Sequence, residues 1–152
     1  MTEHLKLLQA KLAYLSRMRS YLTYSLGQIS PVLAQPDGAL LTNEQHESMA
    51  AFRVRFSEFQ EHLGKAMRAV AIEEELDVER FGAVLAFMER LQVLDSVEHW
   101  KLIRELRNAV NHEYEDDMAR IAEFFSLMSR ETPTLFGYFD RLSAHCASAY
   151  GL

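Results

Sequence analysis

A short polar segment near position 110 combines side chains that can move a proton with one that can hold a phosphate. Arg107, Asn108, His112 and Tyr114 all fall within the string RNAVNHEY. Histidine exchanges a proton near neutral pH, and arginine presents a permanently charged planar fork to phosphate oxygens. Such a pair can stabilise the charge that builds when a 2'-hydroxyl of RNA attacks its own phosphate, and this chemistry needs no metal ion.

The spacing of Arg107 and His112 leaves several interpretations open. Five residues correspond to about 140° around a regular helix, so the two positions do not share a face. Asn111 can end the helix, because asparagine tolerates the left-handed conformation at a C-cap. Either the helix end then turns His112 inward or a second subunit completes the site. The simplest alternative is a solvated last helical turn, where the helix dipole favours cations without any catalytic role.

The other reactive residue types give no second candidate site, so we expect neither a metal nor a cofactor. His112 and Glu113 begin like the zinc-binding pattern H-E-x-x-H, but Asp116 stands where the second histidine belongs. The single cysteine, Cys146, allows no disulfide within the chain and no thiolate cluster, which favours a reducing, cytoplasmic setting. We expect structural roles for the remaining histidines: His4, His46, His62, His99 and His145.

Length and composition indicate one globular domain over residues 1–152. The chain has 49% hydrophobic residues, 16 Lys and Arg, and 22 Asp and Glu, for a net charge of -6. No apolar run is long enough for a secretory leader or a membrane span, so we expect no membrane association. The overall acidity argues against DNA binding and other loose binding to long nucleic acids. Residues 99–112 are locally basic, with three cations against one acid and a net charge of +2, which suits a small RNA site.

Leucines at three- and four-residue steps predict a long amphipathic helix over residues 3–29. Leu7, Tyr14 and Tyr21 form a second stripe, which predicts that this helix meets neighbours on two sides. A loop containing Pro31 and Gly38 is expected to follow.

Five further helices are expected, and their start signals differ. Thr42 and Gln45 form a capping-box pattern for a helix that runs to about residue 75. Asp77 and Ser96 are expected to cap the third and fourth helices, the latter burying Trp100. A fifth helix follows the acidic residues 115–117, and Pro133 is expected to begin a short sixth helix. Because no stretch alternates with period two, the fold should be an all-α, up-and-down helical bundle.

The string RNAVNHEY resembles the R-x4-H-x-Y motif of HEPN-domain proteins, specifically the HepT-like toxins that pair with MNT-type nucleotidyltransferase antitoxins. Arg107, His112 and Tyr114 match the three motif positions, and Asn108 matches the polar residue that often follows the arginine. The segments FRVRFSEFQEHLGKAMRAVAIEEEL, ERLQVL and WKLIRELRN resemble the order of helices in that family over about residues 1–130. The tail after Pro133 extends beyond a minimal HEPN domain.

This resemblance implies a metal-independent endoribonuclease whose active site forms across a homodimer. His112 would be the general acid/base, Arg107 the phosphate-stabilising cation and Asn108 a supporting residue. The family also implies that the antitoxin transfers AMP to Tyr114 and thereby blocks the nuclease. The implied partners are therefore an RNA substrate, a second copy of the chain and a nucleotidyltransferase. The alternative is a non-catalytic helical module that only binds the nucleotidyltransferase.

Overall fold

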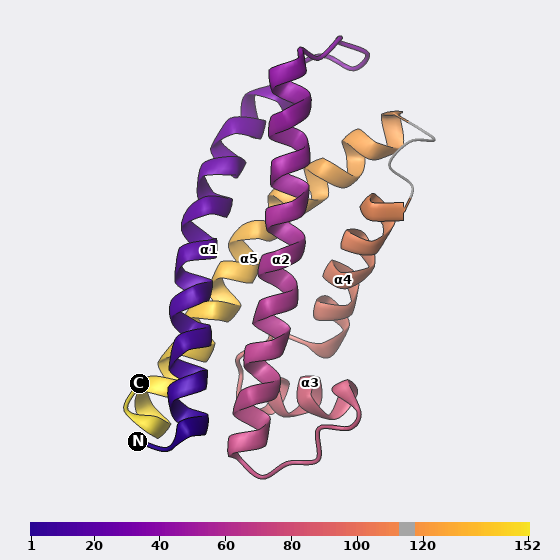
Figure 1. The fold of residues 1–152 in the computed structure, drawn as a ribbon. Coiled ribbons are helices and arrows are strands. Elements are labelled where there is room, and N and C mark those ends of the chain that lie inside the picture. The colour runs from indigo at the N-terminus through magenta and orange to yellow at the C-terminus, as the bar shows by residue number, and fades with distance from the viewer. Residues whose placement is uncertain (113–117) are drawn as a thin grey trace.

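The computed structural model describes the backbone of residues 1–112 and 118–152, and the side chains of residues 1–111 and 119–152. Throughout this part of the chain the fold is all-α, and no strand occurs in it. The chain runs up and down through long helices, with the short α3 crossing one end of the bundle (Figure 1). The helices are α1 (Glu3–Leu33), α2 (Asn43–Glu73), α3 (Phe81–Arg90), α4 (Val97–His112) and α5 (Met118–Tyr150). None of these helices is long and apolar enough to cross a membrane.

The long helices α1 and α2 form the most extensive pair, and α5 crosses behind them (Figure 1). The predicted leucine stripe of α1 supplies fully buried residues, among them Leu8, Leu15 and Leu22. The α2 stripe of phenylalanines is equally buried, and Phe52 and Phe59 contact phenylalanine rings of α5. These faces build a single continuous core, so burial of apolar area is the main term that stabilises the bundle.

The two prolines that were expected to separate elements lie inside helices. Pro31 lies within the last turn of α1, and Pro133 lies in the middle of α5. The predictions of a break at Pro31 and of a separate sixth helix from Pro133 are therefore wrong. In both places the residue before the proline hydrogen-bonds to its own helix. The hydroxyls of Ser30 and Thr132 donate to the carbonyl oxygens four residues earlier. Such contacts accompany the local bending that lets a helix continue through proline.

The predicted capping signals were right at two helices and wrong at a third. The Thr42 capping box is present in full, and Ser96 accepts a hydrogen bond from the His99 backbone at 3.0 Å. Asp77 does not cap α3, which begins four residues later after Arg80 and has no side-chain cap. Asp77 instead accepts from the backbone of Glu79, which forms a local turn.

The second stripe of α1 lies largely at the surface. Leu7, Tyr14 and Tyr21 are 61%, 41% and 55% exposed, so the predicted second buried side is absent. The reason is that α2 and α5 both pack near the Leu8 face and leave this stripe at the surface. There Tyr14 meets the His62 ring of α2 edge to face, and the Arg17 guanidinium lies over the Tyr14 ring at 5.6 Å.

Candidate functional site

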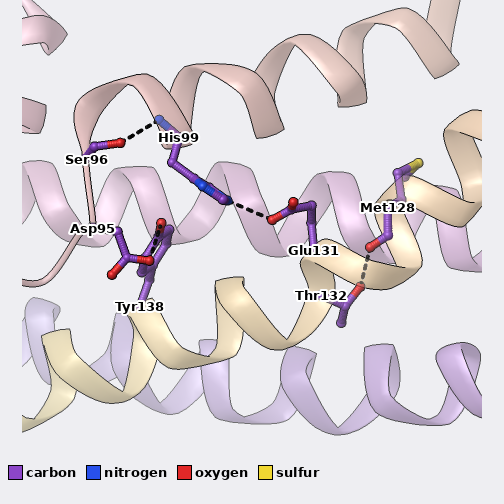
Figure 2. A network of polar contacts seen from close by, with 7 residues as sticks. All are labelled: Asp95, Ser96, His99, Met128, Glu131, Thr132 and Tyr138. Carbon is purple, nitrogen blue, oxygen red and sulfur yellow. Dashed lines mark hydrogen bonds and ion pairs between the residues drawn. The ribbon is translucent and has the colours of Figure 1, made fainter.

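The site begins with α4, which is fixed to α5 at its N-terminal end. Figure 2 shows the cap from Ser96 and, beside it, the His99 ring pointing across to α5. His99 Nε2 lies 2.8 Å from a carboxylate oxygen of Glu131, and the His99 ring meets the Tyr138 ring edge to face at 6.2 Å. Because these contacts join the first turn of α4 to α5, they fix the axial position of α4.

Tyr138 and Asp95 extend this anchor to the loop before α4. The Tyr138 hydroxyl donates to Asp95 at 3.3 Å, and Arg141 donates to the same carboxylate at 2.8 Å (Figure 2 shows the first contact). The hydrogen bond from Arg141 holds the pKa of Asp95 below its usual value. Burial, together with the negative charge of Asp95, raises the pKa of Tyr138 to about 12. Tyr138 therefore remains a neutral donor at neutral pH.

The other end of α4 is fixed to α2 by Asn111. Its amide oxygen accepts a 2.9 Å hydrogen bond from Arg53, and its amide nitrogen lies 3.5 Å from the Ser57 hydroxyl. The helix continues to His112, so the expectation that Asn111 ends the helix is wrong. The Asn111 side chain makes two contacts to α2. It therefore does not compete for backbone hydrogen bonds, which is the effect that usually favours asparagine at helix caps.

Arg107 lies between these two anchors and is held by side chains on both sides. Its Nη1 donates to Gln60 Oε1 on α2 at 2.8 Å, and its Nη2 donates to the neighbouring Asn108 Oδ1 at 3.2 Å. The side chain is half-buried, and its Nε is buried without a hydrogen-bond partner in the described residues. The guanidinium is thus oriented on one edge and has an unused donor on another.

The electrostatic surroundings of Arg107 are mixed. Burial lowers the pKa of Arg107, the nearby positive charge of Arg104 lowers it further, and Glu61 opposes both effects. An arginine starts from a pKa above 12, so it stays charged at neutral pH in spite of these shifts. An anion that neutralises both charges would therefore stabilise this half-buried cation and the second cation beside it.

Of the four predicted site residues, two have side chains within the described part of the chain and two do not. Arg107 and Asn108 contact each other directly. His112 is the last residue of α4, but its side chain lies outside the described residues, as does all of Tyr114. In the described residues, no three His, Cys, Asp or Glu side chains are grouped as a metal site would require.

Gln60 is the site residue that the sequence reasoning missed. It is only 3% exposed and supplies the acceptor that orients Arg107. The signal was present, because Gln60 is a polar residue on the apolar face of α2, one turn from Phe56 and next to Phe59. A polar side chain at a core position needs a hydrogen-bond partner, and here that partner is the arginine of the motif.

Comparison with family models, curated proteins and solved structures finds no match to this chain. The HEPN resemblance therefore stays a prediction that depends on the motif residues and on the order of helices.

Proposed function

We propose that the chain is a metal-independent endoribonuclease of the HepT-like toxin type. The observation that carries this proposal is the state of Arg107, which is oriented by Gln60 and Asn108 and has a buried, unused Nε donor. A cation that is fixed before the substrate arrives stabilises developing negative charge without a further reorganisation cost. The hydrogen bond from Arg107 to Asn108 is consistent with Asn108 as a supporting residue that holds the guanidinium in place.

In this mechanism His112 removes the proton from a ribose 2'-hydroxyl, and the 2'-oxygen forms a bond to the adjacent phosphorus. The bond from phosphorus to the 5'-oxygen breaks, and that oxygen leaves with a proton supplied by a general acid. The products are a 2',3'-cyclic phosphate and a 5'-hydroxyl end. Arg107 stabilises the phosphate oxygens while their charge increases.

The regular course of α4 favours a site shared by two copies of the chain. α4 continues to His112, so positions 107 and 112 are separated by about 140° around its axis. In a homodimer, Arg107 of one copy and His112 of the other need not share a helix face. Transfer of AMP to Tyr114 by a nucleotidyltransferase would add a bulky anion two residues from His112 and exclude the RNA phosphate by size and charge.

A second candidate function is a non-catalytic partner of a nucleotidyltransferase. The exposed stripe of Leu7, Tyr14 and Tyr21, together with Tyr24, favours it. Tyrosine is enriched in protein interfaces, and exposed apolar stripes mark interaction surfaces more often than random positions do. This candidate predicts a stable complex and no RNA cleavage by the isolated chain.

RNA cleavage in the presence of EDTA distinguishes the two candidates. We expect wild-type protein to cleave and His112→Ala to lower the rate by roughly 10²- to 10⁴-fold, because it removes the acid/base group. Arg107→Ala should also lose activity, whereas Arg130→Gln, an exposed change on α5, should not. Circular dichroism must show that all variants fold alike, and intact mass must show that Tyr114 carries no adduct. Cleavage by His112→Ala at the wild-type rate would refute the assignment.

A further inference from the structure

A cavity of about 350 Å³ lies between α2, α3 and α4, and Arg107 forms part of its wall. This volume falls at the small end of the range of about 300–1,000 Å³ typical of ligand pockets. Two helix faces line it, each with residues at three- and four-residue spacing, so their side chains project toward the same space. These residues are Glu61, Lys65 and Arg68 on α2 and Trp100, Arg104 and Arg107 on α4.

The cavity concentrates positive charge in a chain whose net charge is -6. Lys65, Arg68, Arg104 and Arg107 line it, against Glu61 as the single acid in the lining. Lys65 and Glu61 form an exposed pair at 3.6 Å, which contributes little. Arg68 and Arg104 are exposed and have no ion-pair partner among the described residues. The unpaired charge therefore faces the space in which an anion would sit.

Two residues of the same lining carry buried donors that have no hydrogen-bond partner in the described residues. Trp100 is 1% exposed, and its Nε1 has no hydrogen-bond partner in the described residues. The Nε of Arg107 is buried in the same state. Buried N–H groups are nearly always paired in native proteins, so two unpaired donors on residues that line one cavity are unusual. Water that solvates the exposed cations does not pair these two buried donors.

The rest of the lining consists of Gln60, Gly64 and Phe81, and its part around Gly64 is apolar and closely packed. Gly64 lies on the α2 side, where a Cβ would lie 3.4 Å from the Phe81 ring and 3.5 Å from the Trp100 ring. The cations thus share the cavity lining with a small apolar surface. The cavity is larger than one phosphate group requires, so the sugar attached to a phosphate also has room in it.

We propose that this cavity is a phosphate subsite for RNA that binds the phosphodiester next to the one cleaved. Lys65, Arg68 and Arg104 hold this non-scissile phosphate and its nucleotide, while Arg107 stands between the subsite and the reacting phosphate. The identity of the ligand as RNA rests on the proposed function; the binding of a phosphate-linked nucleotide rests on the cavity. Arg104 and Arg68 position the substrate and take no part in bond breaking.

The test measures binding without cleavage. A short, 5'-labelled RNA with 2'-O-methyl groups at every position cannot be cleaved by 2'-hydroxyl attack, and its affinity is measured by fluorescence anisotropy. Trp100 is the only tryptophan of the chain, so its emission reports ligand in the cavity directly. We expect a saturable change in Trp100 emission with the same midpoint as the anisotropy curve. The logarithm of the affinity should fall with the logarithm of salt concentration with a slope of roughly -2 to -3, as three or four phosphate contacts require.

The decisive comparison is between Arg104→Gln and Arg130→Gln. Both remove one exposed positive charge from a helix, but Arg130 lies on α5 and outside the cavity lining. We expect Arg104→Gln to weaken binding by about tenfold and to reduce the salt slope by about 0.7, with little change in Arg130→Gln. Equal weakening in both variants, or a Trp100 emission that does not respond, would overturn the subsite.

Failure of the subsite and failure of the proposed function give different results. If the uncleavable RNA binds in an Arg104-dependent way but wild-type protein cleaves no RNA, the subsite stands and the nuclease proposal fails. If cleavage depends on Arg107 and His112 while Arg104→Gln binds the probe as wild type does, only the subsite fails.

Discussion

The hydrogen bond between Gln60 and Arg107 can be measured without any assumption about activity. Gln60→Leu keeps the volume of the side chain but removes the buried acceptor 2.8 Å from Arg107 Nη1. A hydrogen bond to a charged group contributes about 1.5–3 kcal/mol, and the unpaired donor left behind adds to the loss. We therefore expect Gln60→Leu to lower the free energy of unfolding by about 2 kcal/mol.

The same reasoning predicts how a second substitution combines with the first. Arg107→Met also breaks the contact, and it leaves Gln60 unpaired. The double variant Gln60→Leu/Arg107→Met replaces both polar groups by apolar ones, which can be close to neutral. Its loss should be smaller than the sum of the two single losses by about 1.5–3 kcal/mol. This coupling free energy isolates the contact itself from changes in helix propensity or solvation.

Urea unfolding followed by far-UV circular dichroism measures the change in the free energy of unfolding for each single variant and for the double variant. With a denaturant slope of about 2 kcal/mol/M, a loss of 2 kcal/mol moves the midpoint by about 1 M, well above experimental error. All variants must be compared at one protein concentration, because self-association would shift the midpoint by mass action. Additive losses, with a coupling below about 0.5 kcal/mol, would refute the orientation of Arg107 by Gln60.

Two further predictions use the shifted pKa values of buried groups. The folded-state pKa of Tyr138 is raised to about 12, above the unfolded value of about 10, so its contribution to stability is complete below pH 10 and is lost as the pH rises towards 12. Unfolding measured from pH 9 to 11.5 should show a steeper loss in wild type than in Tyr138→Phe; parallel curves would contradict the burial of this hydroxyl. Cys146 is fully buried, and burial raises the pKa of its thiol to about 11, so the native chain should react with iodoacetamide at pH 8 far more slowly than the urea-unfolded chain. Mass spectrometry would measure both rates, and equal rates would contradict the placement of this side chain in the core.

The periodic parts of the sequence predicted the fold well because burial dominates there. The apolar residues of α2 from Phe52 to Val70 are buried at three- and four-residue steps, and Trp100 lies in the core as expected. Capping was predictable at Thr42 and Ser96 because the hydrogen bond is local. The exposed Tyr14 and Tyr21 were not predictable, since only the full arrangement of α2 and α5 decides which face of α1 stays uncovered.

The prolines were misinterpreted because a local rule was applied where packing decides. A proline inside a helix costs about 3 kcal/mol through its missing N–H and its clash with an earlier carbonyl. After Pro133, however, α5 buries Leu135, Tyr138, Leu142 and Cys146. Each large buried side chain contributes roughly 1.5–3 kcal/mol, so continuation of the helix more than offsets the cost of the proline.

The candidate site was only half predictable for a related reason. The motif placed Arg107 beside Asn108 along the chain, and the two side chains do contact each other. Gln60 and Lys65 come from a helix more than thirty residues earlier, and only the packing of α2 against α4 brings them near Arg107. A motif identifies the reacting groups, whereas the groups that orient them and bind the rest of a substrate come from tertiary structure.

The anchors of α4 and the donors in its cavity have opposite effects on the stability of the free protein. At one end His99 is paired with Glu131, and at the other Asn111 is paired with Arg53, so the helix is held firmly on two neighbours. Between these anchors, Arg107 Nε and Trp100 Nε1 are buried without partners, which costs stability in the absence of a ligand. Natural sequences accept such local conflicts mainly at functional sites. Because α4 is fixed at both ends, the helix cannot shift to relieve these donors, so the free protein carries their cost in stability.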